Sequence, residues 1–249
     1  IDLLVQQAIA ATPPHYDFIS DDGVHHQLWP LGENISAALV EAFTAVETLY
    51  IADGHHRSAS AVKVAGERGL AADDPRASIM AVIFPASDLK VLAYNRVVAD
   101  LAGHTPEEFL AALAPHFDVE PAAAGAAQPQ QRGHFGVFVG GRWYRARYTR
   151  PLSGDVIADL DTSILTNAVL QPILGIHDLR TDKRISFVGG AAGTEKLERE
   201  AGDTGVAFSL FPTSVADVMA VSDATAIMPP KSTWFEPKLA SGLFIHSFA

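Results

Sequence analysis

Hydrophobic and polar positions follow two periodicities along the chain, and together they predict helices interleaved with strands. Short apolar or alternating runs indicate strands, whereas apolar residues that recur every three or four positions indicate helices. Because hairpin signals are frequent, we predict a mixed α/β (α+β) fold with a mixed sheet and several β-hairpins, rather than a purely parallel sheet. The expected strands are residues 16–19, 24–31, 48–52, 78–84, 90–98, 133–139, 142–148, 184–188 and 206–210. The expected helices are residues 3–11, 34–43, 57–69, 105–117, 160–174, 194–201 and 214–221.

Glycine-containing turns predict which strands are neighbours. Gly140-Gly141 is a two-residue connection of the kind that hairpins favour, and Asp22-Gly23 signals another hairpin near the start of the chain. Residues 78–84 and 90–98 are expected to pair around the loop that contains Pro85. Local turn chemistry therefore predicts three antiparallel strand pairs.

One low-complexity segment suggests a division of the chain. Residues 121–131 carry almost no charge and no large apolar side chain, so we expect a mobile surface loop there. The loop separates an α/β region at 1–120 from a C-terminal α/β region at 132–249. We expect the two regions to pack together as one unit.

Composition and charge exclude several classes of protein. The 249 residues are 48% hydrophobic, which is enough for a sizeable core, and the net charge of −11 argues against a general nucleic-acid or anionic-membrane surface. The absence of cysteine excludes disulfides, thiolate zinc sites and cysteine nucleophiles. No apolar run approaches the roughly 20 residues of a membrane span. We therefore expect a soluble protein, and a cytoplasmic location fits this composition.

The most informative segment is the polar pentapeptide Asp53-Gly54-His55-His56-Arg57, which separates a predicted strand from a predicted helix. Such a strand-to-helix elbow directs backbone N–H groups and the positive end of the helix dipole toward one point, and its glycine lets a ligand approach the main chain. These features are typical of a phosphate site. Arg57 adds a forked cation suited to phosphate, and Ser58 follows it in the first turn.

The acidic and imidazole groups of the elbow have several possible roles. Asp53, His55 and His56 are the candidates for moving a proton or orienting a nucleophile, and Asp53 is also the candidate metal ligand. A metal-dependent hydrolase would hold its ion with these three residues, together with His25 or His26. The simplest alternative is that Asp53 caps the helix and that the other residues are only solvated.

A second polar cluster lies near the C-terminus, at residues 228–238. Two prolines stiffen the backbone before Lys231, Ser232 and Thr233, so this loop would present one ammonium group and two hydroxyls to a phosphate or carboxylate. The glycines of a Walker P-loop are absent. The alternative is an ordered surface loop whose aromatic residues pack into the core. A third cluster, at residues 175–184, mixes both charge signs and is expected to be a solvated loop with local ion pairs.

Three blocks of sequence together resemble the bacterial domain-of-unknown-function family 1015. The first is the elbow at 53–57, the second comprises residues 174–176 and 185–190, and the third comprises residues 228–233 and 237–243. Their order and spacing match that family, and Asp22-Gly23 through Leu28-Trp29 is also similar to it. Family members carry a substantial N-terminal region that is absent before Ile1, so the resemblance does not establish that any site is complete in these residues.

The elbow also resembles a nucleotide-phosphate motif. Gly54-His55-His56-Arg57 is similar to the Gly-x-x-Arg motif of the ParB and sulfiredoxin superfamily, which includes free-serine kinases. This resemblance implies that these four residues hold nucleotide phosphates, that Asp53 is the base or metal-orienting carboxylate, and that the region has a ParB/sulfiredoxin-like fold. Fold analogy alone does not establish an activity.

These observations lead to one preferred function and two alternatives. The preferred function is a nucleotide- or phosphate-binding protein, such as a small-molecule phosphotransferase that uses ATP or ADP with Mg²⁺. The alternatives are a metal-dependent hydrolase and a non-catalytic nucleotide-sensing or partner-binding module. The expected partners are a small phosphate or nucleotide ligand and a second copy of the chain in a homodimer, with no general nucleic-acid binding and no membrane.

Overall fold

The fold is described from a computed structural model, which describes residues 1–236, 238–240 and 242–246. Within the chain two compact units are distinguished, Ile1–Ile51 and Ala52–Ala249. In the described residues, no helix has both the length and the apolar character needed to cross a membrane.

The N-terminal unit consists of two helices and one hairpin, as predicted. Its hairpin is antiparallel, with Tyr16 opposite Leu28 and Ile19 opposite His25. One exposed carboxylate, Asp17, accepts hydrogen bonds from His25 Nε2 at 2.6 Å and Gln27 Nε2 at 2.9 Å across the two strands. The elements are α1 (Asp2–Ala11), β1 (Tyr16–Ile19), β2 (His25–Leu28) and α2 (Glu33–Phe43).

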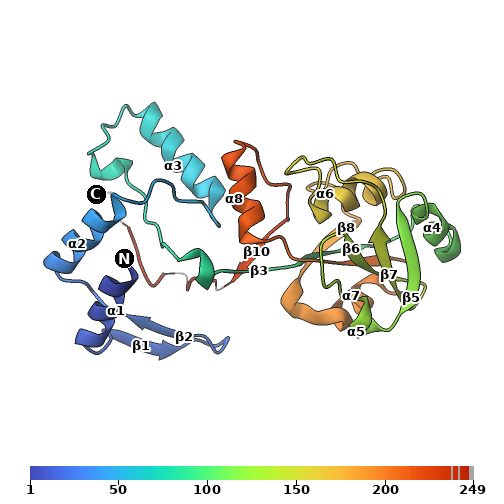
Figure 1. Cartoon of the computed structure of the whole chain (residues 1–249), viewed down its shortest axis with the longest axis horizontal. Coiled ribbons are helices and arrows are strands. Elements are labelled where there is room, and N and C mark those ends of the chain that lie inside the picture. Colours follow the sequence, from blue (N-terminus) through green and yellow to red (C-terminus); the bar gives the residue numbers. More distant parts are fainter. Residues whose placement is uncertain (237, 241, 247–249) are drawn as a thin grey trace. The chain divides into compact units, whose positions relative to one another are not determined.

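The larger unit is built on a six-stranded antiparallel sheet with the strand order β5-β7-β6-β9-β4-β8. Strands β5, β6, β7 and β8 of this sheet are labelled in Figure 1. This sheet combines strands from both sides of the loop predicted at 121–131. The central hairpin turns at Gly140-Gly141, where both residues have positive φ, as a two-residue hairpin turn requires. The strands are β4 (Tyr94–Val98), β5 (Phe117–Ala122), β6 (His134–Val139), β7 (Arg142–Tyr148), β8 (Ile185–Gly189) and β9 (Val206–Leu210).

Successive strand residues point to opposite faces of this sheet, and apolar residues on both faces are covered by helices. In β9, Phe208 joins the core that lies against α4 and α6, whereas its neighbour Ala207 joins the core beneath α5 and α7. The fold therefore has two apolar layers, one on each face. The helical elements are α4 (Pro106–Leu113), α5 (Ala124–Ala127), α6 (Asp161–Leu165), a π-helical segment (Thr166–Leu170), α7 (Gly193–Ala201) and α8 (Val215–Asp223).

A second, two-stranded sheet lies against α8 (Figure 1). Its strands β3 and β10 are antiparallel, with Phe235 opposite Val91, and both of these residues are buried with Val218 of α8. Ala52, which immediately precedes the elbow, also packs against this cluster. The remaining elements are α3 (His55–Glu67), β3 (Lys90–Leu92), β10 (Trp234–Glu236) and the 3₁₀ turns Pro75–Ala77, Ala86–Asp88 and Gly190–Ala192.

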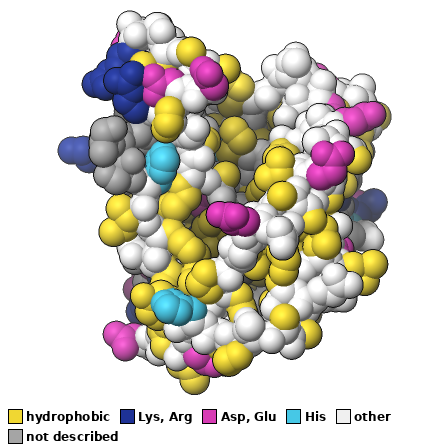
Figure 2. All heavy atoms as spheres, turned by 90° about the vertical axis from the view of Figure 1, so that its left-hand side faces the viewer, with side chains coloured by type: hydrophobic (Ala, Val, Ile, Leu, Met, Phe, Trp, Pro, Cys, Tyr) yellow, Lys and Arg dark blue, Asp and Glu magenta, His cyan; other side chains and the backbone are white. Residues whose placement is uncertain are grey.

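Two of the predicted strands do not form. Residues 48–52 and 78–84 adopt neither helix nor strand, and their apolar side chains are largely exposed, with Leu49 at 59% and Met80 at 52%. An apolar run becomes a strand only when a neighbouring strand pairs with its backbone, and these two segments have no such partner among the described residues. Figure 2 shows many exposed hydrophobic side chains, in yellow, on the face that it presents.

Two further expectations about local structure are wrong. The run at 90–98 is divided into two strands. β3 pairs with β10, and β4 pairs with β8 and β9, so the predicted hairpin around Pro85 does not exist. The predicted loop at 121–131 contains the end of β5 and the short helix α5, in which Ala127 is fully buried. Gly136 in β6 allows this helix to pack closely on the sheet, because a Cβ atom at position 136 would lie only 2.4 Å from the Ala127 carbonyl oxygen.

Candidate functional site

At the elbow, the carboxylate residue Asp53 directly precedes the N-terminus of a helix that has no side-chain cap. Gly54 is the N-cap of α3, with φ at 84°, and no side chain caps this helix among the described residues. Asp53 Oδ1 instead accepts the Gly54 N–H at 2.7 Å, so Asp53 is not the helix cap that the simplest interpretation required. The N–H groups of the first turn therefore lack a side-chain acceptor, which is the usual condition for binding an anion at this position.

Arg57 folds back over the glycine of the elbow. Its Nη2 atom lies 3.3 Å from where a Cβ atom at Gly54 would be, and its side chain is exposed. An alanine at position 54 would therefore combine an unfavourable positive φ with a close contact to the guanidinium. Glycine at this position allows the forked cation to lie against the main chain at the start of α3.

An ion pair connects the elbow to the segment after β10. Lys238 Nζ lies 3.2 Å from Asp53 Oδ2, and the Lys238 N–H donates to Glu236 Oε2 at 3.2 Å. Partial burial acts to raise the pKa of Asp53, but the Gly54 N–H, the Lys238 ammonium and the Arg57 charge outweigh it, so this pKa lies below its usual value. Asp53 is therefore a carboxylate at neutral pH. The pair joins residues 185 positions apart in the sequence.

Two lysines lie over neighbouring aromatic rings, and we call these four residues the cation–aromatic row. Lys238 Nζ lies 5.5 Å from the centre of the Trp234 ring, and Lys231 Nζ lies 5.4 Å from the centre of the Tyr94 ring. The two rings meet edge to face at 5.3 Å. Trp234 Nε1 donates to Glu236 at 2.6 Å, which fixes the orientation of the indole. The row therefore orients two exposed ammonium groups in the same part of the unit.

The backbone at Lys231 is held in a strained conformation by buried hydrogen bonds. Lys231 has φ at 58°, which is uncommon for a residue with a long side chain. The next residue, Ser232, is only 4% exposed and donates from its hydroxyl to the Pro229 carbonyl at 2.8 Å. The Ser232 carbonyl accepts a hydrogen bond from Thr213 Oγ1 at 3.0 Å, and the Ser232 hydroxyl lies 3.2 Å from Thr162 Oγ1. Ser232 thus supports the loop from within, while Thr233 is half-buried.

Arg96, which the sequence analysis did not identify, is the other support of this loop. Its side chain is fully buried, and its guanidinium donates to the carbonyls of Lys231, at 2.9 Å from Nη2, and of Tyr94, from Nη1. The guanidinium carbon also lies 5.3 Å from the centre of the Phe187 ring. The one signal in the sequence is that Arg96 follows Asn95 in the middle of a run, residues 91–99, whose other members are apolar or aromatic.

The environment of Arg96 is unusual for a cation. Nε has no hydrogen-bond partner, and no carboxylate of the described residues forms an ion pair with this side chain. Burial lowers its pKa to about 9, so the group still carries its charge at neutral pH. A buried charge without a counterion raises the electrostatic potential of its surroundings and favours anions nearby.

Two glycines of the second sequence block allow close packing against Trp234, which lies between the two parts of the third block, and against Ala93. A Cβ atom at Gly189 would lie 2.9 Å from Trp234 Cζ3, and one at Gly190 would lie 3.0 Å from the backbone of Ala93. The Gly190 N–H donates to the Ala93 carbonyl at 2.7 Å. Together with the Asp53–Lys238 pair, these contacts bring parts of all three sequence blocks into one region of the larger unit.

The remaining predicted residues contribute less to this region. No contact among those described joins Arg57 to Lys231, and their two segments meet through the Asp53–Lys238 pair and through the packing of Ala52 against the cluster that contains Phe235. Ser58 is half-buried and His55 is exposed, while the side chain of His56 lies outside the described part of the chain. The cluster at 175–184 forms local pairs, as predicted, with Arg184 Nη2 at 3.0 Å from Asp182 Oδ2.

Two histidines of the metal-dependent alternative, His25 and His26, have other partners. Among the residues that the structure describes, no group of three His, Asp or Glu side chains could hold a metal ion. His25 is hydrogen-bonded to Asp17, and His26 lies 3.1 Å from Ser20 Oγ and stacks on Phe18. These contacts account for both histidines locally, within the N-terminal hairpin.

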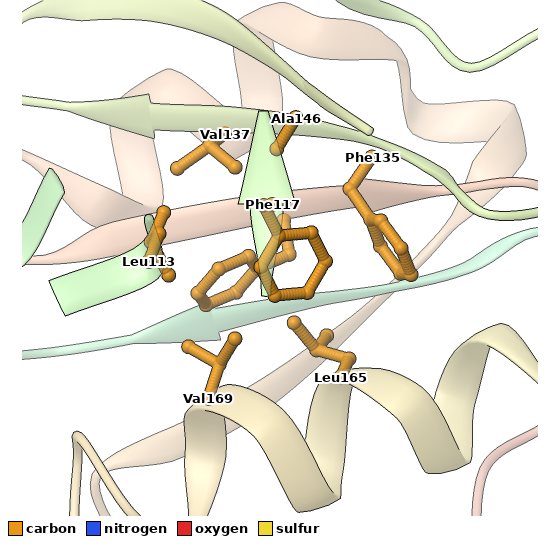
Figure 3. A pocket seen from close by; sticks show the side chains of 8 residues that line it. Leu113, Phe117, Phe135, Val137, Ala146, Leu165 and Val169 are labelled. Carbon is orange, nitrogen blue, oxygen red and sulfur yellow. The ribbon is translucent and has the colours of Figure 1, made fainter. Parts of the chain in front are cut away.

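A small apolar pocket lies within the core and carries no polar group. Figure 3 shows Leu165 and Val169 projecting from the helix toward Leu113 and Phe117 of the facing elements. Every lining side chain is hydrocarbon. Because such a pocket has no polar group to orient a substrate, we interpret it as a packing feature of the core.

Comparisons with solved structures give distant likenesses. A free serine kinase in complex with AMP matches with a TM-score of 0.41 and 15% identity over 83% of this chain and 81% of that chain, and a variant of the kinase in complex with ADP gives the same values. A conserved hypothetical protein from Pyrococcus furiosus matches with a TM-score of 0.39 and 16% identity, over 83% of this chain and 84% of that chain. No curated protein matches.

At TM-scores near 0.4, the nucleotides in those structures carry no information about a ligand of this chain. A protein-family model matches residues 1–163, which is more than half of the chain and includes the hairpin β1–β2, the elbow and strands β4 to β7 of the six-stranded sheet. The chain belongs to the family described as "Protein of unknown function (DUF1015)".

Proposed function

We propose that the chain binds the phosphates of a nucleotide, ATP or ADP, at the elbow, and that it transfers a phosphoryl group to a small molecule. The observation that carries the proposal is the uncapped N-terminus of α3, with Arg57 in its first turn. Backbone N–H groups at a helix start and a forked cation beside them are the two components that phosphate binding most often combines. A ParB/sulfiredoxin-like relationship of the elbow is part of this proposal.

The cations of the second segment extend the proposed site. Lys238 is held at the elbow by its ion pair with Asp53, and Lys231 lies in the same cation–aromatic row. In a protein with a net charge of −11, such a local group of cations is needed to overcome the general repulsion of an anion. We propose that Lys238 exchanges the Asp53 carboxylate for a phosphate oxygen when a nucleotide binds.

Asp53 is assigned the role of orienting the phosphoryl acceptor. Its lowered pKa makes it a weak base, so it would not remove a proton from a hydroxyl early in the reaction. Phosphoryl transfer depends chiefly on positioning and charge neutralisation, which a hydrogen-bonded carboxylate can supply. Its exposed and ionised carboxylate also fits a ligand of hydrated Mg²⁺, which would neutralise phosphate charge when bound with the nucleotide.

Removing the guanidinium of the elbow should weaken phosphate binding. Arg57→Ala is expected to raise the Kd for ATP, ADP and pyrophosphate by about tenfold or more, because a hydrogen bond to a charged group contributes about 1.5–3 kcal/mol. Isothermal titration calorimetry measures this change. Arg68→Ala, at the exposed opposite end of α3, is the matched control and should bind like the parent chain. Equal affinities of the two variants would exclude the elbow as the site.

Replacing the carboxylate should affect turnover more than affinity. Asp53→Asn removes a negative charge that repels phosphates in the ground state, so nucleotide affinity should stay equal or rise, while kcat with a hydroxylated acceptor falls. Steady-state kinetics and calorimetry on the same variant separate these effects, with Asp73→Asn in an exposed loop as the control. An unchanged kcat would remove Asp53 from the chemistry. Nucleotide binding without turnover on any hydroxylated metabolite would favour the non-catalytic sensing module.

A further inference from the structure

A second cavity, separate from the elbow, lies where the end of β7 and the following loop meet α6 and the π-helical segment. Its volume is about 230 Å³ and it is open to solvent, so it has room for a small molecule but not for a larger, drug-sized ligand. Its polar lining comes from His116, Tyr148, Ser153, Asp159 and Asn167. The rest of the lining is apolar, as is common in pockets that orient a ligand through a few polar groups.

Three of these polar side chains have hydrogen-bonding atoms that no protein group engages in the described part of the chain. His116 Nδ1 is buried and has no hydrogen-bond partner among the described residues, although buried polar atoms are nearly always paired. Asn167 is exposed and Tyr148 is half-buried, and no hydrogen bond engages either side chain in the described part of the chain. An imidazole, a phenol and an amide can both donate and accept hydrogen bonds, so they suit a partner with hydroxyl groups.

The backbone around the cavity is specialised. Asn167 and the neighbouring Ala168 belong to the π-helical segment Thr166–Leu170, and both line the cavity. Segments of this type are rare and occur frequently at functional sites. The backbone at His116 is also ordered, because the His116 carbonyl accepts the Thr149 N–H at 3.0 Å and the Thr149 hydroxyl at 3.1 Å. Hydrogen-bonded backbone therefore holds both His116 and Asn167 at the cavity.

The charges at the cavity select against an anionic ligand. Its lining contains no lysine or arginine, and the one carboxylate, Asp159, accepts hydrogen bonds from the N–H and hydroxyl of Ser153 and from the Gly154 N–H. Partial burial raises the pKa of Asp159, but these hydrogen bonds and the Arg132 charge outweigh it and lower the pKa, so the group is ionised. The negative charge of Asp159 repels anions, and the three hydrogen bonds that it already accepts leave it little capacity to bind a cation.

We infer that this cavity binds a neutral, hydroxyl-bearing small molecule of the polyol or monosaccharide class. The ligand would supply the missing partner of His116 and would hydrogen-bond Asn167 and Tyr148, with its carbon face against the apolar lining that includes Ile164. This inference does not depend on the nucleotide site proposed for the elbow.

Ligand-observed NMR on the whole chain tests the inference, with glycerol, ribose, glucose and myo-inositol as probes. At least one probe should bind saturably, and Asn167→Ala should weaken it about five- to tenfold, as the loss of one hydrogen bond predicts. His116→Ala should weaken it by a similar or larger factor. His177→Ala, at an exposed histidine outside the cavity, should have no effect.

Two charged analogues of glucose complete the experiment. Glucose 6-phosphate and glucosamine should bind no more tightly than glucose itself. The inference is overturned if no neutral probe binds saturably up to about 50 mM, a limit near the weakest specific affinities. It is also overturned if both cavity variants bind like the parent chain, or if either charged analogue binds at least about tenfold more tightly than glucose. Asn167 is exposed, so its replacement tests the cavity without disturbing the core.

Discussion

Replacing Arg96 with methionine should lower the free energy of unfolding by about 2–4 kcal/mol, because two part-buried carbonyls would lose their donor at a cost of about 1–3 kcal/mol each. Relief from burying a charge without a counterion offsets part of this cost. The loop at Lys231 would also lose the contact that holds it at positive φ, so pyrophosphate affinity should fall by about tenfold in the folded protein. Urea unfolding and calorimetry measure the two effects.

Two further variants separate the role of this guanidinium from a general loss of stability. Arg96→Lys keeps the charge but not the fork, so it should recover part of the stability and only a small part of the loop geometry. Arg150→Met removes an exposed arginine and should change neither quantity. If Arg96→Met is as stable as the parent chain and binds pyrophosphate equally well, then Arg96 neither supports the loop nor positions Lys231.

The pH dependence of stability should reveal one buried carboxyl group, Asp161. Burial raises the pKa of Asp161 to about 6, and nearby Asp217 acts in the same direction, against the Gly133 N–H and the Arg132 charge. The unfolded chain then loses this proton at lower pH than the folded chain. The protonated Asp161 therefore contributes about 3 kcal/mol to the free energy of unfolding. This contribution is fully present below about pH 4 and is lost as the pH rises through about 6.

A comparison with the asparagine variant isolates this titration. Between about pH 4 and pH 7, the free energy of unfolding of the parent chain should fall by about 2–3 kcal/mol relative to Asp161→Asn, which cannot ionise. The asparagine keeps an acceptor for the Gly133 N–H, now at 2.8 Å from Asp161 Oδ1. Asp203→Asn, at an exposed aspartate, is the control. Parallel pH profiles for the parent chain and Asp161→Asn would show that Asp161 is ionised normally in the folded state.

Elements with local signals were predicted correctly from sequence. α4 begins at Pro106 behind a capping box in which Thr105 and Glu108 exchange hydrogen bonds, and each of these residue types favours a helix start. Ser214 and Asp217 form a second capping box at the start of α8. The turn at Gly140-Gly141 set the register of the central hairpin. In each case the stabilising contacts lie within a few residues, so the residue pattern contains them.

For the candidate site, sequence reasoning located the elbow and the loop at Lys231 but not how they are connected. It did not anticipate that Asp53 would pair with Lys238 instead of capping α3. It also missed Arg96, whose donors reach a carbonyl 135 residues away. Contacts at such separations depend on which strands become neighbours, and no local pattern encodes that.

The sequence by itself determined the mixed α/β class, most helix starts, the central hairpin and the polar elbow with Gly54 and Arg57. Only the tertiary structure decided that the runs at 48–52 and 78–84 remain unpaired, and that Arg96 is buried beneath Lys231. The physical reason is the range of the interactions involved. Caps and tight turns are satisfied within one or two turns of chain, whereas a strand and a buried cation require partners that distant segments supply.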